Sequence, residues 1–366
     1  MRERRDYDGV PPVKRAPFDA QYIPPYFWIG GIAAGSWLVA TLESVGRADR
    51  DVIRSARYIS LGSLLLGTGM LILDLGRPER FLNMLRIVRP GSPMSLGSWA
   101  LAGFGAPAGL ATLIQLAEDG AFGRRAALVA RSRAATARAV HLAGLPAALF
   151  VSSYTGSLLA TTSNPSWAVR SRTLPALFAA SAVSSGIAAV SAVLEASGTA
   201  PHARQRLARA QLLALTAEIA LHLADERRAG RLPSAAAAPA TLRVARLATL
   251  LGGMVAPLAL AASASRSPRR RHQGRAAAQD GATSCPDRSR ATALAAGLTL
   301  AGSLALRFLT VHEGDRSARE PADTWAYAAG ATSGKPLRSA AGQPALRQEN
   351  GGRSRVRAPW HRRAVE

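Results

Sequence analysis

Long apolar stretches alternate with short basic segments along most of the chain. Eight of these stretches are about as long as a helix must be to cross a bilayer, so the sequence predicts an all-α membrane protein with about eight transmembrane helices. The expected spans are 26–42, 58–75, 96–116, 139–161, 174–194, 207–224, 242–262 and 291–311. Many spans are rich in small residues, which favours close helix packing. Gly31 and Gly35 have the four-residue spacing typical of such contacts.

The remaining segments are polar or basic. Residues 1–24 form a polar N-terminal arm, 264–290 a basic loop, and 314–366 a basic tail that we expect to be disordered. With eight spans both ends of the chain lie at one membrane surface, which we call face A; the opposite surface is face B. Loops at face B carry about twice as many basic residues as the internal loops at face A. Because cytoplasmic loops carry an excess of basic residues, this favours face B as the cytoplasmic side. The basic arm and tail oppose this bias, so the orientation stays open.

Composition narrows the possible chemistry. The 366 residues carry a formal net charge of +23, but the arginines flank apolar segments as membrane-surface loops do. We therefore expect membrane lipid, and no nucleic acid, around this chain. The single cysteine, Cys285, excludes a disulfide framework, a Cys-ligated iron–sulfur cluster and a Cys-rich zinc site within the chain. The histidines give no convincing pair for a haem, and no metal-ligand spacing is present, so we expect neither group.

Several polar side chains fall inside or at the edge of the spans, where ionisable groups are costly and by default indicate function. Glu218 and His222 share one helix face and, with His141 nearer face B, are weak candidates for a proton path. The residues expected near face A are Gln21, Tyr22, Asp74, Arg77, Tyr154, Glu218 and His222.

Polar groups gathered near one membrane surface suit an amphipathic ligand that is soluble in lipid and exchanges protons, and a quinone fits this description. A tyrosine hydroxyl and a nearby carboxylate can bind its ring oxygens and move its protons. We expect Tyr154 to donate a hydrogen bond and Asp74 to exchange a proton. A structural salt bridge from Asp74 to Arg77 or Arg80 is an equal alternative.

Several stretches resemble the NrfD/polysulfide reductase (PsrC-like) family of integral membrane subunits. Residues 25–35, PYFWIGGIAAG, resemble its first helix, and LDLGRPERFLNML at 73–85 followed by SPMSLGSW at 92–99 is the stronger match. Tyr154-Thr155-Gly156 and then Asn164-Pro165-Ser166-Trp167 resemble its fourth helix and the following loop, and 302–308 its last helix. The likeness is dense over 22–195 and thin from 200 to 290.

The resemblance implies two four-helix bundles. Residues 25–195 would hold the first bundle, the fifth helix and the quinone site, and 196–313 the remainder of the second bundle. By motif position, Tyr154 matches a tyrosine associated with quinone, and Asp74 and Arg77 match the helix-two signature. Gln21 and Tyr22 occupy a zone where many members have polar residues or histidine.

The resemblance also implies partners. Members of the family are quinone-interacting subunits that pair with a ferredoxin-like four-cluster iron–sulfur subunit, and often with a molybdopterin enzyme. We therefore expect a multi-pass subunit of the inner (cytoplasmic) membrane that is not catalytic alone and binds a quinone, with menaquinone the expected type. A proton or solute transporter is an alternative, because ionisable residues at depth also suit alternating access. A passive membrane anchor for a redox enzyme is another.

Overall fold

The structure is a computed structural model that describes residues 13, 21–46, 49–74, 79–265 and 286–330. Within these residues the chain is helical and has no strand. The long helices are α1 (Ile23–Val45), α2 (Arg50–Asp74), α4 (Pro93–Glu118), α6 (Ala134–Ala160), α8 (Leu174–Ser197), α9 (Pro201–Ala229), α11 (Ala240–Leu250), α12 (Ala256–Ser265) and α13 (Pro286–Ala318). The π-helix η1 (Leu251–Val255) joins α11 to α12. The short helices are α3 (Arg80–Met84), α5 (Arg124–Ser132), α7 (Pro165–Val169), α10 (Pro233–Ala236) and α14 (Pro321–Ala328).

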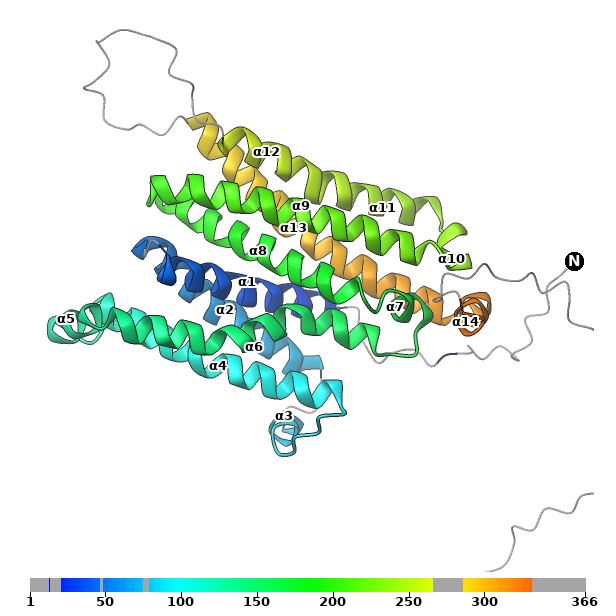
Figure 1. Ribbon diagram of the computed structural model, residues 1–366, viewed down its shortest axis with the longest axis horizontal. Helices are drawn as coiled ribbons and strands as arrows, with labels where there is room; N and C mark the ends of the chain where they lie inside the picture. Colours follow the sequence, from blue (N-terminus) through cyan, green and yellow to red (C-terminus); the bar gives the residue numbers. More distant parts are fainter. Residues whose placement is uncertain (1–12, 14–20, 47–48, 75–78, 266–285, 331–366) are drawn as a thin grey trace, which may run out of the picture.

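The described chain has eight helical segments long and apolar enough to cross a membrane, with α11, η1 and α12 together forming the seventh. This confirms the predicted all-α membrane fold and the predicted span count. The eight segments run roughly side by side (Figure 1), so their ends define two faces. Helices α3, α7, α10 and α14 lie toward one end of the molecule, which is face A, and α5 lies at the other, which is face B.

Helices α1 and α8 occupy the centre of the molecule (Figure 1). Helix α1 packs against α2, α6 and α8, while α4 packs on α6 and on α2. Helix α8 packs against α9 and α13, and α12 packs against both of these. We call α1, α2, α4 and α6 the first-half helices and α8, α9, α11–α12 and α13 the second-half helices. Their division into two four-helix bundles stays a prediction, because α8 also contacts α1, α2 and α6.

Glycine allows the two central helices to approach closely. A Cβ atom added at Gly35 would overlap the backbone of Ala182 and Gly186, and one added at Gly186 would overlap the backbone of Gly35 and Ser36. Gly31, one turn before Gly35, also faces Ala182. The small-residue spacing in the first span therefore marks the contact between α1 and α8, as such spacings do in membrane proteins.

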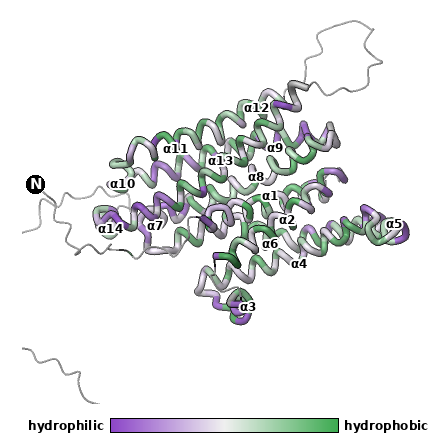
Figure 2. The backbone as a smooth tube through the Cα atoms, turned by 180° about the vertical axis from the view of Figure 1, so that it is seen from behind, coloured by the Kyte–Doolittle hydropathy of each residue, from purple (hydrophilic) through white to green (hydrophobic). Residues whose placement is uncertain are grey.

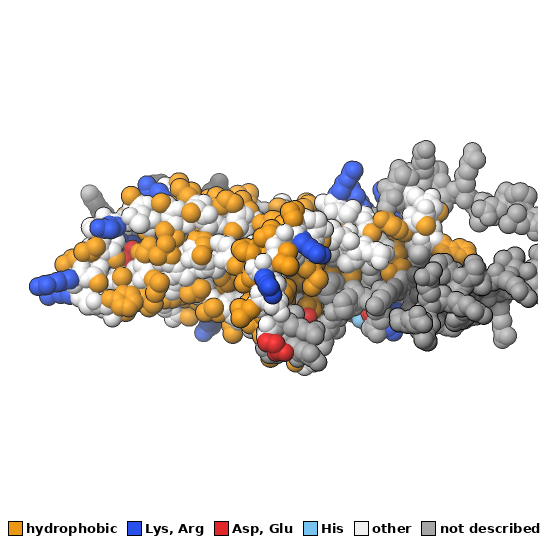
Figure 3. Space-filling view, turned by 90° about the horizontal axis from the view of Figure 1, so that it is seen from below, with side chains coloured by type: hydrophobic (Ala, Val, Ile, Leu, Met, Phe, Trp, Pro, Cys, Tyr) orange, Lys and Arg blue, Asp and Glu red, His pale blue; other side chains and the backbone are white. Residues whose placement is uncertain are grey.

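The outer surface is apolar over the length of the spans. Figure 2 shows hydrophobic residues along the long helices, and hydrophilic residues concentrated toward α3, α5, α7 and α14. In Figure 3 hydrophobic side chains cover much of the visible face, and basic side chains project at its left end. Large exposed side chains such as Leu66, Leu113 and Leu213 lie on span helices, where lipid would cover them.

Part of the predicted disordered tail, 314–366, is ordered, and that part of the prediction is wrong. Helix α13 continues to its end at Ala318, and α14 follows it. The buried Asp323 carboxylate accepts hydrogen bonds from the Ser234 amide (2.9 Å) and from the hydroxyls of Ser234 (2.5 Å) and Ser317 (2.6 Å). These bonds hold α14 against α10 and α13, which apolar periodicity alone does not reveal.

The remaining predicted polar segments lie largely outside the described residues, as do residues 331–366 of the tail. Of the predicted arm, 1–24, the structure describes residue 13 and residues 21–24, and the last two already belong to α1. Of the predicted loop, 264–290, it describes the end of α12 and, from residue 286, the start of α13.

Candidate functional site

A cavity of about 560 Å³ opens at face A between the ends of the first-half helices. It is walled by the start of α1, the end of α2, the start of α4 and the end of α6, and α3 contributes Met84. Leu71, Leu101 and Leu158 supply apolar surface. The polar side chains that line it are Tyr26, Asp74, Ser98, Tyr154, Thr161, Thr162, Ser163 and Asn164.

Asp74 and Tyr154 both line this cavity. Asp74 is the last residue of α2, and Tyr154 lies six residues before the end of α6. Both helices run from face B to face A, so the alternation of spans brings the two residues to the same end of the molecule. The structure thus combines two side chains that lie 80 positions apart in the sequence.

The Tyr154 ring lies against a glycine of α4. A Cβ atom at Gly97 would overlap the far end of the ring, including the hydroxyl. Phe150, one turn earlier on α6, stacks on Tyr154 with ring centroids 5.5 Å apart. Among the described residues the Tyr154 hydroxyl has no hydrogen-bond partner, so it is available to a ligand in the cavity.

Six polar side chains that line the cavity were not predicted from the sequence, namely Tyr26, Ser98, Thr161, Thr162, Ser163 and Asn164. Tyr26 belongs to the PYF segment at the start of α1. Ser98 donates to the Met94 carbonyl oxygen at 2.9 Å, one turn earlier on α4. Asn164 accepts from the Ser166 amide and donates to the Gly314 carbonyl oxygen at 2.6 Å. Asn164 therefore ties the cavity wall to α13.

The other predicted quinone contacts either do not line the cavity or lie outside the described residues. Gln21 and Tyr22 form the turn directly before α1 and are not among the lining residues, although the next residue, Ile23, is. Arg77 lies outside the described residues. Of the five predicted contacts, the structure therefore brings together Asp74 and Tyr154.

His141 belongs to a different polar cluster, near face B. Arg57 donates from Nε to His141 Nε2 at 3.0 Å, and from Nη1 to Gln115 Oε1 at 2.8 Å and Glu118 Oε2 at 3.2 Å. Trp37 packs on the His141 ring with centroids 4.8 Å apart. Sequence reasoning placed Arg57 in a loop, but α2 already begins at Arg50 and only 3% of Arg57 is exposed.

Glu218 and His222 lie within the second-half helices. The Glu218 carboxylate accepts from the Ser184 hydroxyl at 2.5 Å. Arg307 is equally buried and donates from Nη1 to the Ser181 hydroxyl at 2.8 Å, with its guanidinium 4.2 Å from the centre of the Phe178 ring. These groups are separate from the 560 Å³ cavity, since none of them lines it.

An ion-pair cluster closes the face A end of the second-half helices. Arg170 Nη1 lies 3.1 Å from both Asp225 Oδ2 and Glu313 Oε2, and Arg246 Nε lies 2.6 Å from Glu313 Oε1. Burial alone would lower the pKa of Arg170, but the carboxylates of Asp225 and Glu313 outweigh it and raise that pKa above its usual value. Arg170 therefore stays charged, and the cluster is structural.

No group of three His, Cys, Asp or Glu side chains within the described ranges could hold a metal ion. The chemistry that the 560 Å³ cavity offers is hydrogen bonding and proton exchange at a site with apolar walls. A volume of this size is typical of a pocket for one small organic ligand.

Comparison with known families fits this geometry. Residues 13–224 match the family described as polysulphide reductase, NrfD. The chain belongs to the NrfD family. The matched range contains every side chain that lines the 560 Å³ cavity. No curated protein matches the sequence.

Membership in the NrfD family gives a general role. Its proteins are generally membrane subunits of oxidoreductase complexes, interact with quinones, and typically pair with iron–sulfur and molybdopterin subunits. The eight apolar helices of this chain agree with a multi-pass membrane subunit. The match ends at residue 224, within α9, so the rest of the second-half helices lie beyond it.

Proposed function

We propose that this chain is the quinone-binding membrane subunit of an oxidoreductase complex, and that the 560 Å³ cavity is its quinone site. The observation that carries the proposal is the presence of Asp74 and Tyr154, whose hydroxyl has no partner among the described residues, in one apolar-walled cavity at face A. Menaquinone is the proposed ligand, and the inner (cytoplasmic) membrane the proposed location. The chain alone would not be catalytic.

The residues present fit a quinone headgroup. Leu71, Leu101 and Leu158 offer an apolar surface to its ring, and the glycine at position 97 leaves room for the Tyr154 phenol beside α4. When bound, a quinone supplies two-electron, two-proton redox chemistry. The polar groups at the cavity then have separate tasks, which are hydrogen bonding and proton exchange.

Tyr154 would donate its hydroxyl proton in a hydrogen bond to a ring oxygen of the ligand. When the ligand is reduced, Asp74 would take up a proton from water at face A and pass it to the ligand, and when the ligand is oxidised Asp74 would accept a proton from it. We propose that Arg77 holds Asp74 ionised between turnovers, and that Gln21 and Tyr22 contact the ligand from the turn before α1. Tyr26, on the first turn of α1, is a second hydroxyl able to reach the cavity.

Electrons would pass between the quinone and a cluster of a ferredoxin-like four-cluster iron–sulfur subunit, with a molybdopterin subunit beyond it in the complex. We place this partner at face A because the cavity opens there, and a short distance between ligand and cluster favours electron transfer. Glu218 and His222, and separately His141, stay candidates for proton movement away from the quinone site.

The decisive test is Tyr154→Phe in the assembled complex. It removes one hydroxyl and keeps the ring that packs on Phe150. We expect quinone-dependent turnover and the quinone retained per purified complex both to fall about tenfold, the cost of one lost hydrogen bond to a buried oxygen. Subunit stoichiometry should not change.

A matched control is Tyr58→Phe, which removes a hydroxyl that donates to Asp119 near face B; it should leave both quantities unchanged. Unaltered turnover and quinone content in both Tyr154→Phe and Asp74→Asn would remove these residues from the site and favour a passive anchor. Solute uptake by the chain alone in liposomes, with no iron–sulfur subunit copurifying, would favour a transporter.

A further inference from the structure

A stripe of buried polar residues follows helix α9 through the second-half helices. Gln211, Glu218, His222 and Asp225 recur at intervals of seven, four and three residues, which places them on one helix face. Their exposed fractions are only 6%, 2%, 5% and 2%. Ionisable residues are rare in membrane-spanning helices, and where they occur they by default indicate function.

Helix α13 carries a second stripe of the same kind. Thr299, Ser303, Arg307, Thr310 and Glu313 lie on one face and are all buried. The two stripes meet where Gln211 Nε2 donates to Thr299 Oγ1 at 3.3 Å. We call these nine residues of α9 and α13 the polar seam.

Helix α8 completes the polar seam from the side. Its Ser184 donates to Glu218, and its Ser181 accepts from Arg307. Because α8 packs against both α9 and α13, the two serine hydroxyls lie between the carboxylate and the guanidinium. None of the described residues forms a salt bridge with Glu218, so Ser181, Ser184, Arg307 and His222 are the polar groups around it.

The polar seam is incompletely satisfied along its middle and its face B end. Three buried atoms, Gln211 Oε1, His222 Nδ1 and Arg307 Nε, have no hydrogen-bond partner in the described part of the chain. At the face A end the contacts are complete, with Arg170 bonded to both Asp225 and Glu313. If the seam served only to hold the helices together, its middle should be as well paired as this end.

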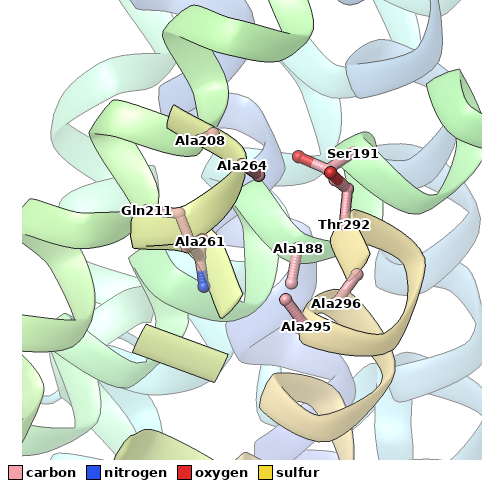
Figure 4. A pocket seen from close by; sticks show the side chains of 9 residues that line it. All are labelled: Ala188, Ser191, Ala208, Gln211, Ala261, Ala264, Thr292, Ala295 and Ala296. Atoms are coloured by element: carbon pink, nitrogen blue, oxygen red, sulfur yellow. The ribbon is translucent and has the colours of Figure 1, made fainter. Parts of the chain in front are cut away.

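A small cavity lies beside Gln211 at the face B end. Its volume is about 20 Å³, enough for one water molecule. Figure 4 shows Gln211 of α9, Ser191 of α8 and Thr292 of α13 among its lining side chains. Gln211 Oε1 and the Ser191 hydroxyl can hold a water there, which would also satisfy the unpartnered amide oxygen.

We infer that Glu218 is a proton-exchanging carboxyl group, and that it is supplied from face B through a hydrated site at Gln211. Seven residues of α9 separate the two side chains, a rise of about 10 Å. The Thr299 hydroxyl contacts Gln211 at one end of this interval, and the Ser184 hydroxyl contacts Glu218 at the other. The Glu218 carboxylate accepts a proton passed along these groups, and the hydrated site regains one from water at face B. The ion pairs of Arg170 close the face A side.

This inference does not depend on the proposed quinone site, which lies among the first-half helices. It is tested by infrared spectroscopy of the purified full-length chain in lipid nanodiscs, without quinone or partner. We expect a carbonyl band of a protonated, buried carboxyl group that shifts on transfer to D₂O. Glu218→Gln should remove this band, while the matched variant Glu195→Gln, at the face B end of α8, should keep it.

The proton route from Gln211 to Glu218 is tested by the rate at which the carboxyl band shifts in D₂O. Gln211→Leu should slow hydrogen–deuterium exchange at Glu218 about tenfold, because it removes a hydrogen-bonding link. Thr216→Val, at an exposed position of α9 outside the polar seam, should leave the rate unchanged. Melting temperatures of the variants report whether each one folds.

Absence of a Glu218 band from acidic to alkaline pH in the folded protein would overturn the inference. A rate that does not respond to Gln211→Leu, or that responds as strongly to Thr216→Val, would overturn the assigned route. Either result would leave the quinone proposal untouched.

Discussion

The face A cavity of the first-half helices and the polar seam of the second-half helices use similar side chains in opposite ways. In the cavity, Asp74 and Tyr154 lie around about 560 Å³ of space with apolar walls. In the seam, Glu218 and Arg307 are packed among hydroxyls of α8, and the pocket beside Gln211 holds about 20 Å³. The cavity offers space for a ligand beside its polar groups, whereas the polar groups of the seam contact one another.

The difference arises from how closely the helices approach. Helices α13 and η1 meet at Gly302 and Gly253, where an added Cβ on either would overlap the other residue's backbone. Such contact leaves space for little more than a water molecule. At the cavity, Gly97 instead gives its space to a side chain, Tyr154. The space beside a buried polar residue therefore determines whether it can contact an organic ligand, whereas proton exchange needs room for no more than water.

The largest effect should come from breaking the ion-pair cluster that closes the seam. Arg170→Met removes the cation shared by Asp225 and Glu313. Glu313 keeps its ion pair with Arg246, but the buried Asp225 carboxylate loses its salt bridge. We expect the free energy of unfolding to fall by about 3–5 kcal/mol. Reversible unfolding in mixed detergent micelles measures this change.

The matched control is Arg172→Met, two residues further on and exposed, which should change the free energy by less than about 0.5 kcal/mol. Because the pKa of Arg170 is raised, its contribution is complete below the usual arginine pKa and is lost only as the pH rises through the higher folded-state value. The difference in the free energy of unfolding between the two variants should therefore stay constant between neutral and mildly alkaline pH. A strong dependence near neutrality would show that Arg170 is not held in this way.

The apolar pattern was enough to predict the helices and the surface at which Asp74 and Tyr154 lie. Eight spans fix the direction of each helix, and direction fixes which end of a helix faces which surface. The cavity itself could not be predicted, since its volume depends on contacts such as that of Tyr154 with Gly97, 57 positions apart.

The burial of two arginines also could not be predicted from the sequence. Arg57 and Arg170 lie at the edges of apolar runs, where basic residues normally face water or lipid headgroups. Each is buried only because partners arrive from distant helices, such as His141 for Arg57 and Glu313 for Arg170. Helix ends that continue beyond the apolar run, as α2 does, make such pairs possible.

Substitution at the contact between the two halves of the molecule should have the second-largest effect on the free energy of unfolding. Gly35→Ala places a methyl group into the backbone of α8, so α1 and α8 must separate. We expect a loss of about 1–3 kcal/mol in the free energy of unfolding, measured as for Arg170. Gly30→Ala, on the same helix but with nothing within 4 Å of the added Cβ, should be neutral or stabilising by up to about 1 kcal/mol. Equal effects of the two would mean that α1 and α8 do not cross at Gly35.

The smallest change in stability, and the most specific change in binding, should come from Gly97→Ala. The added methyl overlaps only the far end of the Tyr154 ring, which can swing aside, so the free energy of unfolding should change by less than about 1 kcal/mol. The displaced hydroxyl would no longer meet the ligand, and the quinone retained on purification should fall about tenfold, as in Tyr154→Phe. Gly103→Ala, at an exposed position on α4 with open space around it, should retain the full amount of quinone.

Combining Gly97→Ala with Tyr154→Phe should lower the retained quinone no further than either change alone, because both act through one hydroxyl. Additive losses would place Gly97 in contact with the ligand itself.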